Sequence, residues 1–327
     1  MYTIKELQKL ISEEINTEII RLNEKEPQNL YGPISYTLAM GGKRLRPVMV
    51  LLACNLFTDK VEKAFPAAMA IEVFHNFTLL HDDIMDHAEM RRNSPSVHVK
   101  FNENIAILSG DAMSIMAYNY LKKSKNDNLS NMIGLFSQTA LEVCEGQQFD
   151  MDFEARIDVS IPEYLNMIRL KTAVLLACSL KMGALAANAP ERIADLLYVF
   201  GLNLGIAFQL QDDLLDVFAD QEKFGKKIGN DIVSNKKTFL LLKALECGVD
   251  HTKKELLEWI NQKEFLPEKK IEAVKLIYSK LKIKEITENA IDEFYQSALN
   301  VWHEIDLAKE TKAELLLLAN MIMNRDH

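Results

Sequence analysis

Residues 75–92 read His-Asn-Phe-Thr-Leu-Leu-His-Asp-Asp-Ile-Met-Asp-His-Ala-Glu-Met-Arg-Arg, an apolar helical run that leads into three aspartates and then two arginines. On an α-helix, Asp82 and Asp86 lie about 40° apart around the axis and roughly 6 Å apart along it. Two carboxylates on one face repel each other unless a cation neutralises them. Mg²⁺ suits this pair, because it takes one or two carboxylates and completes its shell with water and substrate phosphates. For a single motif of this kind, a solvated acidic helix face is almost as good an interpretation.

The same pattern occurs a second time in the chain. Residues 208–216 read Phe-Gln-Leu-Gln-Asp-Asp-Leu-Leu-Asp, and an apolar run from Leu202 to Phe208 again precedes the aspartates. A surface patch that arises by chance rarely recurs with the same spacing and the same apolar approach. Two acidic clusters on two helices, each with basic residues downstream, suit a diphosphate held between them by several metal ions. We therefore expect the two clusters to face each other across an apolar cavity.

The composition of the chain favours an all-α protein. Among its 327 residues there are only 12 Gly and 8 Pro, while 48% are hydrophobic, so sharp turns are few and a sizeable core can form. The formal charge of −9 gives no global basic field and argues against nucleic acid as a partner. No apolar stretch of about 20 residues predicts a membrane span, and the start of the chain does not resemble a signal peptide. We expect a soluble cytoplasmic protein whose residues 1–327 form a single domain.

Basic residues gather at two glycine-containing stretches. Residues 41–47, Gly-Gly-Lys-Arg-Leu-Arg-Pro, form a turn in which Lys43 can act as a point charge and Arg46 can grip a phosphate with two hydrogen bonds. Many helix starts look like this turn, so it gains weight from the two acidic motifs. Residues 224–238 form a lysine-rich loop that can fold over a diphosphate, although such a composition usually belongs to an ordinary solvated loop.

Isolated polar side chains on apolar helices are further candidates. His75 lies two turns before Asp82 and about 20° from the same helix face, which favours a binding role over a structural one. Lys171 interrupts an apolar stretch and must pair with an anion or reach water. Gln147 and Asp150, near the end of another helical run, are candidates for facing the cavity.

Six pieces of the chain, in this order, resemble the trans-isoprenyl diphosphate synthases of the polyprenyl synthetase family. They are Gly41 to Pro47, the motif from Asp82 to Asp86 with Arg91, Arg92 and Pro95, Gly146-Gln147 with Asp150, Lys171-Thr172, Gln209 with the motif from Asp212 to Asp216, and the loop from Gly225 to Lys236. The resemblance covers essentially the whole chain. It implies an all-α fold of the isoprenoid synthase type, in which one large bundle of antiparallel helices surrounds a deep central cavity, built as a homodimer.

The resemblance also implies a role for each matching residue. Asp82 and Asp86 would ligate two Mg²⁺ ions with Asp83 nearby, and Asp212 and Asp216 would hold a third ion with Asp213 in support. The residues that match those gripping the allylic diphosphate are Arg91, Lys171, Lys226 and Lys236. The residues that match those binding isopentenyl diphosphate are Lys43, Arg46, His75 and Arg92. Phe208, Gln209 and Thr172 would line the point where the two substrates meet.

The length of the product depends on the side chains that close the cavity one or two turns before Asp82. Those side chains are Phe77, Thr78 and Phe74, and Phe77 lies roughly 7.5 Å back along the axis. Family members that make long products tend to have a small residue at the position of Phe77, so the chain resembles a short-chain enzyme. Farnesyl-producing relatives usually add a second aromatic residue at the position of Thr78 or an insertion in the first motif. Neither is present, which favours geranylgeranyl diphosphate (C20) over farnesyl diphosphate (C15).

Two other classes of protein share part of this pattern. A class I terpene cyclase also ionises an allylic diphosphate with metal ions, but its second motif is typically built from Asn, Ser and Glu. A non-catalytic subunit of a heteromeric synthase usually loses one acidic motif. Both motifs are whole here, so we expect a catalytically active, Mg²⁺-dependent prenyltransferase with three ions per site.

Overall fold

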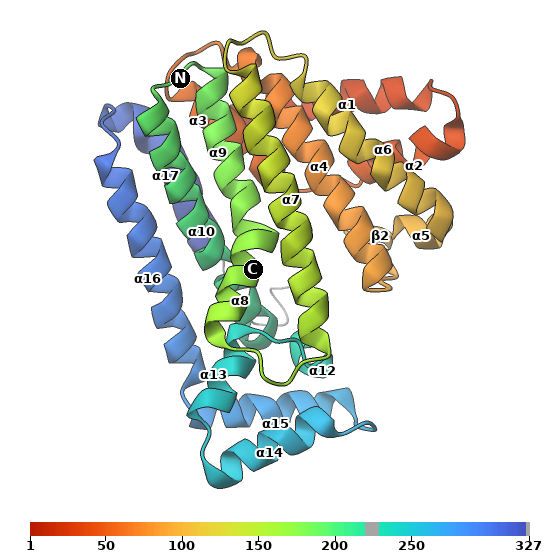
Figure 1. Ribbon diagram of the computed structural model, residues 1–327, viewed down its shortest axis with the longest axis vertical. Coiled ribbons are helices and arrows are strands. Elements are labelled where there is room, and N and C mark those ends of the chain that lie inside the picture. Colours follow the sequence, from red (N-terminus) through yellow and green to blue (C-terminus); the bar gives the residue numbers. More distant parts are fainter. Residues whose placement is uncertain (220–228, 325–327) are drawn as a thin grey trace. The chain divides into compact units, whose positions relative to one another are not determined.

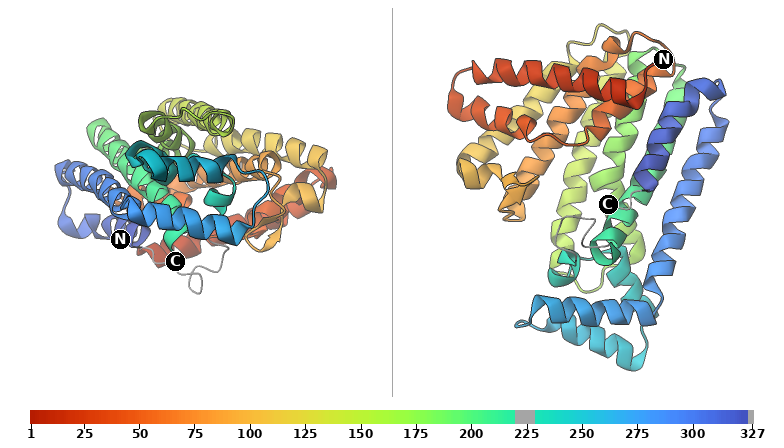
Figure 2. Two further views of the ribbon diagram at one scale, coloured as in Figure 1. Left: turned by 90° about the horizontal axis from the view of Figure 1, so that it is seen from below. Right: turned by 180° about the vertical axis from the view of Figure 1, so that it is seen from behind.

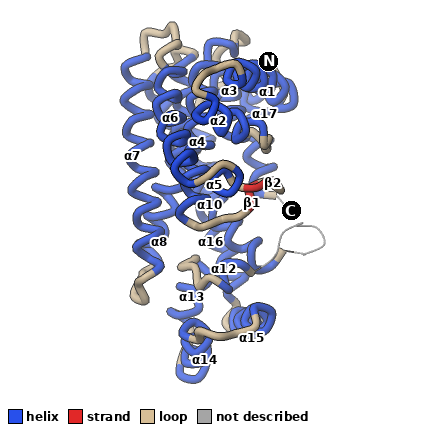
Figure 3. The backbone as a smooth tube through the Cα atoms, turned by 90° about the vertical axis from the view of Figure 1, so that its right-hand side faces the viewer, coloured by secondary structure: helices blue, strands red, loops and turns tan. Residues whose placement is uncertain are grey.

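The computed structural model describes residues 1–219 and 229–324, and helices dominate it (Figure 1). The predicted all-α fold class is therefore confirmed. Within these residues the only strands are β1 (Met90–Arg91) and β2 (Ser94–Pro95), which pair antiparallel with Arg91 opposite Ser94 (red in Figure 3). Asn93, at the tip of this hairpin, has a left-handed backbone (φ 61°), a conformation that asparagine tolerates better than most residues.

Contacts divide the chain into two compact units. The first comprises Met1–Gln138, Cys178–Tyr198 and Asp306–Leu316, and the second comprises Thr139–Ala177, Val199–Ile305 and Leu317–His327. The long helices with residues in both are α7 (Leu129–Glu154), α9 (Val174–Ala186), α10 (Glu191–Phe218) and α17 (Lys309–Met323). One domain around a deep cavity, and the convergence of the two acidic motifs, stay predictions.

In the first unit, α1 (Ile4–Asn23) begins after Thr3, which forms a capping box with Glu6. Helix α1 packs on α2 and α3, and its apolar residues Leu7, Ile11 and Ile15 are buried. Helix α4 contacts α6 over much of its length (Figure 1). The remaining elements are α2 (Gln28–Ala39), α3 (Leu45–Asn55), η1 (Val61–Ala64), α4 (Phe65–Met85), α5 (Val97–Lys100) and α6 (Glu103–Leu121).

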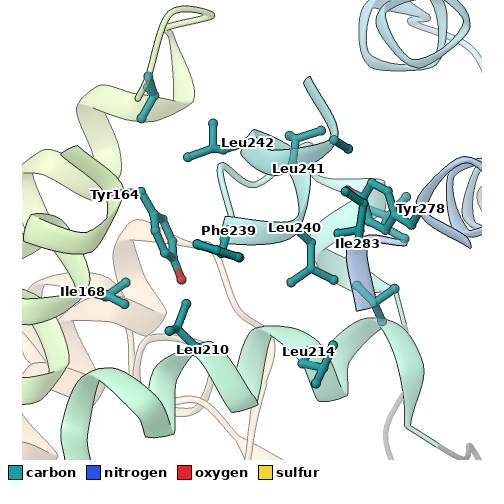
Figure 4. Packing of buried hydrophobic residues seen from close by; sticks show 14 of the residues in the cluster. Tyr164, Ile168, Leu210, Leu214, Phe239, Leu240, Leu241, Leu242, Tyr278 and Ile283 are labelled. Atoms are coloured by element: carbon teal, nitrogen blue, oxygen red, sulfur yellow. The ribbon is translucent and has the colours of Figure 1, made fainter. Parts of the chain in front are cut away.

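In the second unit, α14 and α15 lie side by side (Figures 1 and 2). Figure 4 shows its core, where Tyr164, Phe239 and Tyr278 pack among leucines and isoleucines from several helices. Its further elements are α8 (Ile161–Ile168), η2 (Arg169–Ala173), α12 (Asn230–Val233), α13 (Phe239–Cys247), α14 (Asp250–Asn261), α15 (Pro267–Lys280) and α16 (Ile283–Glu304). The segment η2 is a single turn of π-helix between α8 and α9.

Helix α10 is long and apolar enough, by length and composition alone, to cross a membrane. Its most apolar window has a mean hydropathy of 1.6, and half of that window is buried inside the protein. The core helix of a soluble protein passes the same test, so this one helix is weak support for a membrane span.

Candidate functional site

The first acidic motif lies at the C-terminal end of α4. Asp82 is half-buried and Asp86 is exposed, and the backbone N–H of Asp86 donates to the carbonyl of Asp82 (2.8 Å) at the last turn. The end of a helix carries partial negative charge, so carboxylates there are unfavourable without a cation.

Asp83 has a different environment from its two neighbours. It is only 3% exposed and accepts two hydrogen bonds from Arg91 Nε, at 2.9 and 3.2 Å. Burial disfavours the charge of Arg91, but Asp83, followed by Asp82 and Asp86, outweighs burial and raises the pKa of Arg91. Asp83 thus fixes an arginine beside the motif, so that Asp82 and Asp86 are the motif's carboxylates best placed to hold a metal ion.

Arg92 joins the hairpin to the glycine turn of residues 41–44. Its guanidinium donates to the carbonyl of Gly41, and a Cβ on Gly42 would lie 2.8 Å from Arg92 Cζ. Gly42 also has a φ of 128°, a backbone conformation that residues with a side chain rarely adopt, so the backbone favours glycine at this position. Two motifs that lie far apart in the sequence are therefore in direct contact in the first unit.

A buried ion pair fixes the other side of this turn. Arg44 has a left-handed backbone (φ 48°), pairs with Glu72 of α4 and donates to the carbonyl of Leu38 (2.6 Å). Asn76 donates a further hydrogen bond to Glu72 (2.8 Å). This set was not predicted from the sequence, although an acid inside the apolar run of α4 was a signal that a buried cation must accompany it.

Arg46 and His75 form the pair predicted to bind an anion. Arg46 Nη1 lies 3.1 Å from His75 Nε2, and since the guanidinium can only donate, the imidazole nitrogen accepts. Burial, and then the guanidinium of Arg46, lower the pKa of His75 well below its ordinary value. His75 is therefore neutral, and Lys43, on the same turn, is exposed.

The side chains predicted to limit product length lie on another face of α4. The ring of Phe77 packs against Phe74 (5.4 Å between centroids) and His81 (4.7 Å), and Phe74 packs against Phe136 of α7 (5.2 Å). The hydroxyl of Thr78 donates to the carbonyl of His75 (2.8 Å). Phe77 is thus part of a continuous aromatic stack in the first unit.

The second acidic motif, on α10, is organised around Asp213. This buried carboxylate accepts hydrogen bonds from the hydroxyl of Tyr164 (2.5 Å) and from the amide of Gln209 (3.0 Å), whose oxygen accepts from Thr172 (3.0 Å). Figure 4 shows the Tyr164 hydroxyl pointing toward α10. Burial raises the pKa of Asp213 to about 6. Tyr164 was not predicted from the sequence, because a tyrosine in an apolar helix is indistinguishable there from a core residue.

Lys171 lies in the π-turn and pairs with Asp150. Its Nζ is 2.6 Å from the carboxylate, and Lys236 approaches the same group at 3.9 Å. Burial opposes the charge on Asp150, but Lys236 and Lys171 outweigh it and lower its pKa. A Cβ on Gly146 would lie 2.3 Å from the backbone nitrogen of Lys171, so glycine allows α7 to pack against this turn. The prediction that Lys171 pairs with an anion or reaches water is confirmed, whereas the expectation that Asp150 faces a cavity stays a prediction.

Asp216 and Asp231 complete the cluster of the second unit. The backbone N–H of Asp231 donates to Asp216 Oδ2 (3.0 Å), and that of Gly229 donates to the Asp216 carbonyl (2.7 Å). Burial, and then the charge of Asp213, raise the pKa of Asp231 to about 7, while burial raises the pKa of Asp216. Asp231 was missed, since an acid in a lysine-rich loop looked solvated.

Within each unit the carboxylates suit Mg²⁺ in their chemistry, because neighbouring carboxylates repel each other and a hard divalent cation with oxygen ligands relieves that repulsion. Within residues 1–219 and 229–324, no three His, Cys, Asp or Glu side chains converge on one metal position. That is compatible with an ion that takes one or two carboxylates and draws the rest of its shell from water and phosphate. Asp212, Phe208 and Gln147 are half-buried, whereas Lys226 lies outside the described residues.

Comparisons with known proteins agree on one family. The polyprenyl synthetase family model matches residues 27–279. A geranylgeranyl diphosphate synthase from Methanosarcina mazei is 43% identical over 225 residues, which cover 68% of this chain and 69% of the relative. A geranylgeranyl pyrophosphate synthase from Geoglobus acetivorans is 36% identical over 99% of this chain and 98% of the relative. A crystal structure of a geranylgeranyl pyrophosphate synthase matches with a TM-score of 0.93 and 46% identity over 99% of both chains.

Proposed function

Since the chain belongs to the polyprenyl synthetase family, we propose that it is a trans-prenyltransferase that joins isopentenyl diphosphate head to tail, in the E configuration, to an allylic diphosphate. The observation that carries the proposal is the same in both units: aspartates at the end of an apolar helix lie beside cations that they hold in place. Arg91 on Asp83 and Lys171 on Asp150 are the two examples. A diphosphate site requires carboxylates that hold metal ions and cationic side chains that donate hydrogen bonds to the phosphate oxygens.

We assign the candidate residues to four tasks. Asp82, Asp86, Asp212 and Asp216 would hold three Mg²⁺ ions, which would neutralise the diphosphate so that it can leave. Arg91, Lys171, Lys226 and Lys236 donate charge-assisted hydrogen bonds to the oxygens of the allylic diphosphate. Lys43, Arg46, His75 and Arg92 bind isopentenyl diphosphate. Asp83 and Asp213 position their partners rather than the substrate, because Arg91, Tyr164 and Gln209 occupy them.

The chemistry then needs no nucleophile from the protein. Departure of the diphosphate leaves an allylic cation, and the double bond of isopentenyl diphosphate attacks it if the two are held close in the correct orientation. Fixed cations stabilise the charge that develops on the leaving group. Loss of a proton, which the released diphosphate can accept, regenerates an allylic product. Thr172, Gln209 and Phe208 line the point of reaction, where water must be excluded because it would quench the cation.

We propose that the product is geranylgeranyl diphosphate. Two features support C20: Phe77 places a large ring against Phe74 and His81 on α4, and Thr78 presents no second ring at the next position. The relatives named geranylgeranyl synthases support the same assignment.

Product chromatography tests the proposal directly. The purified protein, incubated with Mg²⁺, isopentenyl diphosphate and farnesyl diphosphate, is expected to yield geranylgeranyl diphosphate. Unreacted substrates alone would reject the proposal in favour of a non-catalytic subunit of a heteromeric synthase. A C15 endpoint from shorter primers would make the protein a farnesyl diphosphate synthase.

We further propose that the enzyme is a cytoplasmic homodimer. Exposed apolar side chains on α6 support self-association, since Leu108 and Ile115 are 60% and 63% exposed and Ile107 is 39% exposed. Large apolar groups gathered on one helix mark an interaction surface more often than a solvated one.

A further inference from the structure

Helix α15 lies outside every motif that the sequence suggested, yet it carries a buried lysine. Lys270 is 1% exposed, and its neighbour Lys269 is exposed to solvent. The Nζ of Lys270 donates to Asn235 Oδ1 (2.7 Å) and to the carbonyl of Val233 (3.3 Å), and it lies 4.2 Å from the centroid of the Phe265 ring. Burial lowers the pKa of Lys270.

The partners of Lys270 are unusual for a buried cation. Within residues 1–219 and 229–324, no carboxylate lies within ion-pair distance of its ammonium group, which is satisfied by an amide and a backbone carbonyl. Burial of a lysine without an opposite charge is costly, and an apolar side chain of similar length would fill the same space at less cost. A contribution to stability therefore does not explain why a lysine occupies this position. Its hydrogen bonds to the two acceptors are what an apolar side chain could not provide.

Both acceptors belong to residues 229–238, the segment that carries Asp231 and Lys236. Asn235 has a left-handed backbone (φ 57°), and its own amide donates to the carbonyl of Ile260 (3.1 Å), so its side chain is held from two sides. The backbone N–H of the next residue, Lys236, donates to the carbonyl of Asp231 (2.9 Å). Holding Asn235 thus fixes the direction in which Lys236 leaves the segment.

The same helix also holds the other end of the segment. Gly229 has a φ of 85°, and a Cβ there would lie 2.9 Å from Ile271, the residue after Lys270. Gly229 and Asp231 in turn donate to the carbonyl and the carboxylate of Asp216. One small cavity is lined by Lys270 and Asn235 together with Asp231 and Lys236. Helix α15 therefore contacts the segment at both ends, directly beneath its charged residues.

We propose that Lys270 is a positioning residue, which holds residues 229–238 so that Lys236 and Asp231 stay beside Asp150 and Asp216, where a diphosphate is gripped. This inference rests on the proposed function for the identity of the ligand. Lys270 acts through Asn235 and Val233 and does not touch the substrate.

Calorimetry and hydrogen exchange test this role without requiring turnover. Lys270→Met keeps the volume and removes both hydrogen bonds. We expect its affinity for inorganic diphosphate in the presence of Mg²⁺ to fall by about tenfold, the lower end of the effect of removing a supporting partner. The backbone amides of residues 229–238 should exchange faster than in the unaltered protein. In turnover assays the KM for the allylic diphosphate should rise about tenfold while kcat stays within about twofold.

Two further variants separate positioning from general stability. Lys269→Met, on the exposed side of the same helix, should bind and exchange like the unaltered protein. Asn235→Gly keeps the left-handed backbone but removes the acceptor of Lys270, so it should reproduce the loss, and combining it with Lys270→Met should add little. If Lys270→Met does not fold, Asn235→Gly carries the test alone.

Normal diphosphate affinity together with unchanged exchange in residues 229–238 would overturn the proposal. So would a loss of affinity that Lys269→Met shares. If the unaltered protein binds diphosphate but makes no prenyl product, the proposed function fails while the role of Lys270 in binding is still measured.

Discussion

Phe77 is the residue whose replacement should change the product. Phe77→Ala removes the ring that packs on Phe74 and His81, so the growing chain can extend further along α4. We expect products longer than C20, detected by chromatography, at a stability cost of up to about 3 kcal/mol for the lost packing. Phe101→Ala, which removes a ring that packs on Tyr36 instead, should leave the product length unchanged. An unaltered distribution in Phe77→Ala would mean that other side chains limit the length.

His75 should make the protein sensitive to acid. Because its pKa is lowered in the folded state, the unfolded chain binds one more proton below its ordinary pKa near 6.5, and stability must fall as the pH falls through that value. The loss is at most about 1.4 kcal/mol per pH unit. His75→Gln, whose amide oxygen can still accept from Arg46, should show less loss of unfolding temperature between pH 6.5 and 5. Parallel curves for the two proteins would contradict a neutral His75.

For single residues, the sequence identified the polar side chains that are candidates for the site, but it did not show which of them pair with one another. The spacing of Asp82, Asp83 and Asp86 cannot tell that the middle one holds Arg91, because the pairing depends on the hairpin that follows. The roles of Tyr164 and Lys270 could not be predicted for a related reason. Their hydrogen-bond partners come from distant parts of the chain, and no motif flanks either residue.

Among the elements, the π-turn Arg169–Ala173 explains why two glycines lie in long helices. A Cβ on Gly205 of α10 would lie 2.6 Å from the Cα of Ala173, a contact with backbone that cannot move aside easily. Gly205→Ala should destabilise the protein by about 1–3 kcal/mol through overpacking. It should also lower kcat, because Lys171 and Thr172 lie in the displaced turn. Chemical denaturation and steady-state kinetics measure the two effects.

The matched control for this change is Gly134→Ala in α7. Nothing lies within 4 Å of a Cβ at that position, so alanine should stabilise the helix by about 0.5–1 kcal/mol and leave kcat unchanged. Equal stability changes in the two variants would contradict the tight packing of the π-turn. Helical periodicity predicted the helices themselves, whereas a π-turn requires one extra residue per turn and leaves no trace in a pattern of apolar positions.

At the scale of the whole molecule, self-association should depend on α6. Leu108→Glu places a charge in the middle of its exposed apolar surface, where desolvation of the carboxylate opposes burial. We expect light scattering after size-exclusion chromatography to show a dimer for the unaltered protein and mostly monomer for Leu108→Glu. Lys122→Glu, at the exposed end of the same helix, is the control and should stay dimeric. A monomeric unaltered protein would reject the homodimer.

The all-α fold was accessible from composition and periodicity, because few glycines and prolines interrupt the apolar runs. The division into two compact units could not be predicted from the sequence, because no linker of distinct composition marks it and four long helices contribute to both units. Local patterns report on the helix that contains them, whereas the grouping of helices depends on contacts between segments distant in sequence.

Helix α4 arranges its functional side chains in three stripes around its axis, of which the first two lie about 80° apart and the third lies about 130–150° from each of them. One stripe carries His75, Asp82 and Asp86, a second carries Glu72, Asn76 and Asp83, and a third carries Phe74, Phe77 and His81. The second stripe holds arginines in place and the third stacks rings. A substitution on the aromatic stripe should therefore leave the residues that recognise the diphosphate group in place. The length of the prenyl chain can then change while diphosphate binding is retained.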